Sequence, residues 1–257
     1  MQITAPDTRP ASTSRRRVVF RTIALLYAFL TGLAMFGIPS VLTAWATSGA
    51  ELPLRTHFVV YGALLGVLVP VAAAALAWRV SVAPAQQLGA VVTACLLGLL
   101  LAPEPENARY MAIVVVPAVL LLWLHPDRAA LLSRRRLDPR MLAVTIVAAV
   151  PAIPYAVVNL RLSAGTHYTD DLHGGYAHAG ILVLGLLGTA LVASARANGW
   201  WVSVASVAVG TTVLGVAGIL YPDDPSSVGG PGGVVALVLA GLFAGAAFVA
   251  ARERAGD

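Results

Sequence analysis

Eight apolar runs, each long enough to cross a lipid bilayer, make up most of this 257-residue sequence. A transmembrane helix needs about 20 mostly apolar residues to cross a hydrocarbon core of roughly 30 Å. The runs cover residues 18–38, 58–78, 85–102, 108–124, 141–160, 174–195, 200–221 and 233–251. The pattern predicts an all-α fold, a polytopic transmembrane bundle of eight helices.

The composition agrees with lipid as the main solvent of the chain. Hydrophobic residues are 58% and charged residues 11% of the sequence, whereas soluble domains have about 45–50% and about 25%. The single cysteine, Cys95, lies inside an apolar run, which excludes an intrachain disulfide and a cysteine-rich metal site. All 17 basic residues are arginine, a bias typical of a GC-rich bacterial genome. We therefore expect a multi-pass protein of the bacterial cytoplasmic (inner) membrane.

The arginines are distributed very unevenly between alternate connections. Every second connection, together with both termini, carries most of them: Arg9, Arg15, Arg16, Arg17, Arg21, Arg79, Arg128, Arg134, Arg135, Arg136, Arg140, Arg196, Arg252 and Arg254. The remaining connections carry only Arg55, Arg109 and Arg161. Because positive residues stay on the cytoplasmic side, this asymmetry predicts that both termini are inside. The positive-inside rule also explains the net charge of +5, so this charge does not indicate nucleic-acid binding.

The polar segments divide the chain into two halves, 18–125 and 141–251. We expect residues 1–17 to form a disordered cytoplasmic tail, 126–140 a basic cytoplasmic linker and 252–257 a short cytoplasmic tail. Arginine, histidine and proline positions recur between the halves at offsets of 115–119: Arg15, Arg16, Arg17 and Arg21 with Arg134, Arg135, Arg136 and Arg140; Ile38-Pro39 with Ile153-Pro154; His57 with His173; Arg79 with Arg196; and Pro103-Glu104 with Pro222-Asp223. The recurrence predicts two parallel four-helix repeats. Chance alignment of Ala-, Val- and Leu-rich runs is the alternative.

Chemistry-bearing residues gather just before and within the start of the sixth run. Three of the five histidines lie between residues 167 and 178, namely His167, His173 and His178, together with Asp170 and Asp171. The topology places this stretch at the outer face. No Asp, Glu or His lies near the middle of a run, so the sequence lacks the intramembrane relay of an ion-coupled pump.

A divalent metal is the most specific ligand that this stretch suggests, with His167, Asp170, His173 and His178 as candidate ligands. Their spacing matches no fixed motif, and the sequence requires no cofactor. The alternative is a solvated loop with a flexible glycine entry at Gly174-Gly175. The acids Glu104, Glu106, Asp223 and Asp224 in neighbouring outer connections would add a negative field that favours cations.

His57, near the outer end of the second run, is a candidate cofactor ligand. Together with His173 or His178 it could bind a single b-type haem between two helices. A second haem is excluded because His125 is alone on the inner side. We expect His57, His173 and His178 to converge at one level near the outer surface, as pseudo-symmetric helix ends would do.

Two classes of function remain open from the sequence. The first is a protein for binding, transport or scaffolding with a His/Asp-lined pocket at the outer face and a small-molecule or lipid ligand. The second is a membrane-embedded enzyme, with or without a metal ion, acting on a lipid or isoprenoid. In the enzyme, His173 and His178 would act as bases or ligands, and Asp170 or Asp171 would orient them. Separately, we expect Gly241 and Gly245 to support close helix packing.

Overall fold

The computed structural model describes all residues except 1–10, 35–36, 47–54, 134, 166–174 and 257. The described residues form helices and connections, without strands. The elements are α1 (Ala11–Phe29), η1 (Leu30–Ala34), α2 (Gly37–Ala46), α3 (Arg55–Ala63), η2 (Leu64–Leu68), α4 (Val69–Trp78), α5 (Val82–Leu101), α6 (Pro105–Leu124), α7 (Arg128–Leu131), α8 (Pro139–Gly165), α9 (Gly175–Ser194), α10 (Trp200–Leu220) and α11 (Gly229–Gly256). The elements η1 and η2 are single π-helical segments.

Eight helical segments among the described residues are long and apolar enough to cross a membrane, as the apolar runs predict. The second segment, Arg55–Trp78, joins α3, η2 and α4, and each segment from the third to the eighth lies within one helix. The first segment falls on α1, η1 and the start of α2. Eight such helices fit an integral membrane protein.

Several helices extend beyond the apolar runs into the segments predicted as tails and linker. Helix α1 begins at Ala11, so residues 11–17 are helical rather than disordered, and α11 continues to Gly256. The linker 126–140 contains α7, whose first turn is capped by the Asp127 carboxylate accepting the N–H of Ala130 at 3.1 Å. Hydrophobicity marks the length inside lipid, whereas the internal hydrogen bonds of a helix do not end where the lipid ends.

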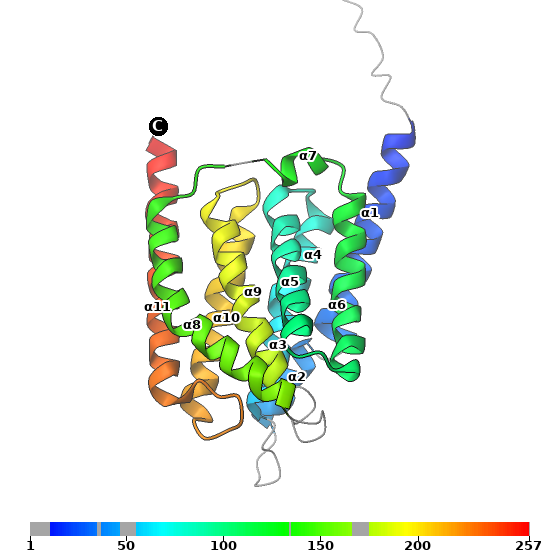
Figure 1. Cartoon of the computed structure of the whole chain (residues 1–257). Coiled ribbons are helices and arrows are strands. Elements are labelled where there is room, and N and C mark those ends of the chain that lie inside the picture. The colour runs from blue at the N-terminus through cyan, green and yellow to red at the C-terminus, as the bar shows by residue number, and fades with distance from the viewer. Residues whose placement is uncertain (1–10, 35–36, 47–54, 134, 166–174, 257) are drawn as a thin grey trace, which may run out of the picture.

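The two halves of the chain have the same packing order. In the first half α1 packs on α4, α4 on α5, α5 on α6, and α6 returns to α1. In the second half α8 packs on α9, α9 on α10, α10 on α11, and α11 returns to α8 (Figure 1). The halves meet through α3, α4 and α5 on one side and α9 and α10 on the other. A repeat would produce this order, and the repeat itself stays a prediction.

Polar contacts connect the halves inside the bundle. The Gln87 amide on α5 donates to the hydroxyl of Ser206 on α10, in the other half, at 3.0 Å, and also to the carbonyl of Leu68 in its own half at 2.7 Å. At one end of the bundle, the N–H of Ala83 donates to the carbonyl of Asn198 at 3.0 Å. Because water is absent from the bilayer core, such buried polar groups stabilise one helix arrangement over others.

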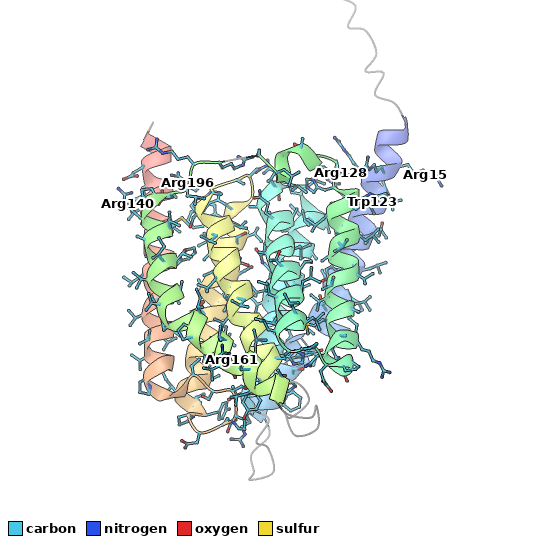
Figure 2. All side chains as sticks on the ribbon, in the orientation of Figure 1. Arg15, Trp123, Arg128, Arg140, Arg161 and Arg196 are labelled. Carbon is cyan, nitrogen blue, oxygen red and sulfur yellow. The ribbon has the colours of Figure 1, made fainter. Side chains whose placement is uncertain are left out.

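Arginine marks one end of the bundle. Figure 2 shows Arg15, Arg128, Arg140 and Arg196 near the end at which α1 begins and α11 ends. We call this the arginine end. Arg161 lies toward the opposite end, where α3 and α9 begin, which we call the histidine end.

A buried ion pair joins three elements at the arginine end. The Arg196 guanidinium lies 3.3 Å from the carboxylate of Asp138 and donates to the carbonyl of Ala250 on α11 at 2.6 Å. The same carboxylate accepts the N–H groups of Arg140 and Met141, so it caps the start of α8. One residue therefore connects the beginning of α8 to the end of α9 and, through Arg196, to α11.

Close packing of α10 and α11 depends on glycines other than Gly241 and Gly245, the pair that the sequence suggests. A Cβ on Gly233 would lie 2.5 Å from the carbonyl oxygen of Gly215, and one on Gly218 would lie 3.0 Å from that of Gly229. Gly241 and Gly245, by contrast, are exposed and would place a Cβ in open space. The expectation that Gly241 and Gly245 support packing within this chain is therefore wrong.

Candidate functional site

Two histidines and a tyrosine from different helices meet at the histidine end. The ring centroids of His57, on α3, and His178, on α9, lie 5.5 Å apart. The Tyr61 ring lies 4.7 Å from that of His178 and 5.7 Å from that of His57. We call these three residues the histidine cluster. Helices α3 and α9 are packed against each other at this end (Figure 1).

The local sequence explains how the cluster forms. His57 and Tyr61 are four residues apart on α3, so they lie on one helix face. On α9, Gly175 and His178 are three residues apart and share a face in the same way. A Cβ on Gly175 would lie only 3.3 Å from Nδ1 of His57, so the absence of a side chain there allows the imidazole to approach the helix.

His178 is the most constrained member of the cluster. Its side chain is 1% exposed, and neither Nδ1 nor Nε2 has a hydrogen-bond partner among the described residues. A neutral imidazole carries one donor and one acceptor, and each costs about 1–3 kcal/mol when it is buried without a partner. A native structure that keeps such a group usually satisfies it with a ligand, an ion or a water molecule.

The loop between α10 and α11 holds the start of α3 in place. The carboxylate of Asp224 accepts the backbone N–H of Thr56 at 3.2 Å and its hydroxyl at 3.3 Å. The guanidinium of Arg55 lies over the ring of Tyr221, 5.3 Å from its centroid. Asp224 therefore orients the turn that carries His57.

The structure tests only part of the predicted convergence. His57 and His178 lie together at the histidine end, as predicted. His167, Asp170, Asp171, His173 and Gly174 lie outside the described residues, so their roles stay predictions. The sequence interpretation missed Tyr61, although its spacing of four from His57 on a helix was a signal that could have found it.

A second buried polar group at this end was also missed. The amide of Asn107, on α6, is 2% exposed, and neither its oxygen nor its nitrogen has a partner among the described residues. Nearby in sequence, Glu104 is the N-cap residue of α6, and one of its carboxylate oxygens is buried. The histidine end is therefore more polar inside than the apolar runs suggest.

The fit of a metal ion depends on the number of ligands. The described residues include no group of three or more His, Cys, Asp or Glu that could hold one. Two imidazoles whose rings are 5.5 Å apart can nevertheless bind the same ion, since a zinc–nitrogen bond is about 2.0–2.1 Å. The described part of the site therefore offers two of the ligands that a metal needs.

A haem between His57 and His178 does not fit this arrangement. Axial imidazoles bind opposite faces of a haem, so the flat macrocycle must pass between them. Here the centroids of the two rings are only 5.5 Å apart, and the Tyr61 ring flanks both, at 4.7 Å from that of His178 and 5.7 Å from that of His57. The pair therefore suits a small ion or polar ligand better than a haem.

Comparisons with protein-family models, with curated proteins and with solved structures give no match.

Proposed function

We propose that this multi-pass membrane protein binds a divalent transition-metal ion at the histidine end, through His57 and His178. One observation carries the proposal: the imidazole of His178 is fully buried beside that of His57, and both of its nitrogens lack a partner among the described residues. A bound ion would satisfy one nitrogen of the His178 ring and would take the His57 ring as its second ligand, and neutral imidazole suits zinc, copper, nickel and iron. The protein then serves in binding or transport of that ion at the membrane surface.

The remaining ligands would come from the segment that precedes α9 or from water. His173 is two residues before Gly175, the first residue of α9, and Asp170 and His167 are a few residues further. Carboxylate and imidazole groups complete such sites in zinc proteins. The Tyr61 hydroxyl would lie beside the ion, where it could form a hydrogen bond to one of the other ligands or line the site.

Removing one ligand tests the proposal. We expect purified wild-type protein to bind Zn²⁺, measured by elemental analysis and titration calorimetry, and Co²⁺, measured by its visible spectrum. The variant His178→Leu should weaken binding by more than about tenfold, because even indirect supporting groups contribute 10–100-fold to metal affinity. It should also keep or raise the thermal stability of the metal-free protein, since an apolar side chain replaces a buried group without a partner.

His125→Leu is the matched control for this experiment. His125 is also buried, but it lies at the C-terminal end of α6, where its Nδ1 accepts the N–H of Asp127 at 3.2 Å. This variant should leave Zn²⁺ affinity unchanged and lower the stability. Wild-type protein that binds no transition metal, or His178→Leu protein with wild-type affinity, would contradict the metal site.

An enzyme acting on a lipid or isoprenoid is the second candidate function. The observation that favours it is the close imidazole–phenol arrangement of His178 and Tyr61, with ring centroids 4.7 Å apart. A buried neutral imidazole can take up a proton from a reacting group, and a phenol can return one. Turnover that survives complete removal of metal by chelators and disappears in Tyr61→Phe would favour this candidate over metal binding.

We further propose that the arginine end faces the cytoplasm of a bacterium. Both termini of the described chain lie at this end, and Arg15, Arg128, Arg140 and Arg196 gather there (Figure 2). Trp123 lies at the same end, where its ring is 5.4 Å from the guanidinium of Arg128. Positive and aromatic residues occupy these interfacial positions in inner-membrane proteins.

Reporter fusions test this orientation. Fusions after Arg136 and after Arg196 should give cytoplasmic signals, and fusions at Glu106 and Asp171 should give extracytoplasmic ones, because arginine is retained on the cytoplasmic side. The measurement is the activity ratio of a periplasm-active to a cytoplasm-active reporter. A cytoplasmic signal at Asp171 would place the histidine cluster on the inner side.

A further inference from the structure

The four helices of the second half line an apolar cavity of about 240 Å³ that is partly open to the outside of the bundle. Helices α8, α9, α10 and α11 all contribute to its wall. An engineered apolar cavity of about 150 Å³ remains dry and binds benzene. A larger apolar cavity that is partly open can therefore hold part of a hydrocarbon chain.

The bend in α8 accounts for the cavity. Pro151 and Pro154 interrupt α8, and Pro151 itself lines the space. Proline removes a helix hydrogen bond and forces a kink, so the two parts of the helix point in different directions. Figure 1 shows that α8 runs beside α11 at the arginine end and turns away from it toward the histidine end. On α11, Gly232 and Ala236 have too little volume to fill the gap.

The wall offers almost no polar groups to a ligand. Its polar side chains are Thr145, Tyr155 and Thr211. The hydroxyl of Thr145 donates to the carbonyl of Met141 at 2.8 Å, and that of Tyr155 donates to the carbonyl of Ser226, so both are already used. A polar ligand would lose its hydrogen bonds with water in the cavity and find few replacements, so its binding is unfavourable.

The cavity opens toward lipid. Its exposed lining residues are Pro151 on α8 and Val235 on α11, and both belong to membrane-crossing segments. On α8 the wall extends from Val144 to Tyr155, which is roughly 16 Å at 1.5 Å per residue. One leaflet occupies about half of a hydrocarbon core of roughly 30 Å, so this length matches one acyl chain.

We propose that this cavity binds one acyl chain of a membrane phospholipid, inserted between α8 and α11. The histidine cluster does not contribute to the wall, because α9 presents His178 to α3 and presents Val183, Leu186 and Ala190 to the cavity. The lipid site is thus separate from the proposed metal site, and either one can fail without the other.

Photocrosslinking in vesicles tests the site. The full-length protein is reconstituted in phosphatidylcholine that contains a phospholipid with a diazirine in its acyl chain, and labelled peptides are identified by mass spectrometry. We expect labelling of cavity-facing positions between residues 144 and 155 and between 235 and 243. In Ala236→Phe, whose ring fills the cavity, this labelling should fall by about tenfold, the factor that corresponds to 1.4 kcal/mol of binding free energy.

Val238→Phe is the matched control, because Val238 is 55% exposed on the lipid-facing side of the same helix. It should leave cavity labelling unchanged. Ala148→Phe fills the cavity from the opposite wall and should reproduce the effect of Ala236→Phe. In every variant, labelling near Val116, which is 63% exposed on α6, should stay at the wild-type level and so report correct insertion.

Two results would overturn the proposal. One is cavity labelling that is the same in both filled variants as in the wild type. The other is labelling by a polyisoprenoid diazirine probe in the absence of labelling by the phospholipid probe, which would assign the cavity to an isoprenoid ligand.

Discussion

Replacing Gly233 by alanine should lower the free energy of unfolding by about 2–3 kcal/mol, the upper part of the range for overpacking. The added methyl group would lie 2.5 Å from the carbonyl oxygen of Gly215 and 3.0 Å from the backbone nitrogen of Ile219. Both are backbone atoms, so a side-chain rotation cannot relieve the contact. Helices α10 and α11 would have to separate along their closest contact.

Gly241→Ala on the same helix is the control for this prediction. Its added methyl group meets no atom within 4 Å, and alanine is the better helix former by about 1 kcal/mol in water. This variant should therefore be neutral or slightly stabilising. The measurement is thermal or denaturant unfolding of both variants in the same detergent, and equal stability of the two would contradict the packing of α10 on α11.

Replacing Asp138 by alanine should destabilise the protein by about 4 kcal/mol, since breaking a buried ion pair costs about 3–5 kcal/mol and losing a helix cap about 1 kcal/mol. We place the value at the lower end because the Arg196 side chain is 22% exposed and keeps its bond to the carbonyl of Ala250. The change removes both the negative partner of Arg196 and the acceptor for the N–H groups of Arg140 and Met141.

Two further variants separate the two contributions. Asp138→Asn keeps an acceptor for the helix start but removes the charge, so its loss should be intermediate. Asp127→Ala removes a cap from the exposed, four-residue helix α7 and should cost less than about 1 kcal/mol. Unfolding curves in which Asp138→Ala and Asp127→Ala coincide would show that the Asp138–Arg196 pair contributes no stability.

The sequence alone determined the features that depend on length, hydrophobicity and charge. Eight apolar runs predicted eight helices that are long enough to cross a membrane, because lipid imposes a minimum length on each. The prolines of the fifth run, at residues 151 and 154, lie inside α8, which bends as proline requires. His178, just inside the sixth run, falls in the first turn of α9.

Tertiary structure decided which faces meet. In a membrane every face of a helix can be apolar, so the sequence pattern gives little information about which side contacts another helix. Gly233 and Gly241 are both glycines of the eighth apolar run. Gly233 lies against Gly215, whereas a side chain at Gly241 would enter open space. The cavity likewise exists because α8 bends away from α11. The sequence of one apolar run does not show how two helices lie relative to each other.

The candidate site shows the same division. The sequence identified His57 and His178 as candidates because charged and titratable residues are rare in the chain. It could not determine that Tyr61 lies 4.7 Å from His178, or that Asp224 binds Thr56 across 168 positions of sequence. Contacts between distant segments depend on how helices pack and rotate about their axes, and that is set by side-chain packing and buried hydrogen bonds over the whole bundle.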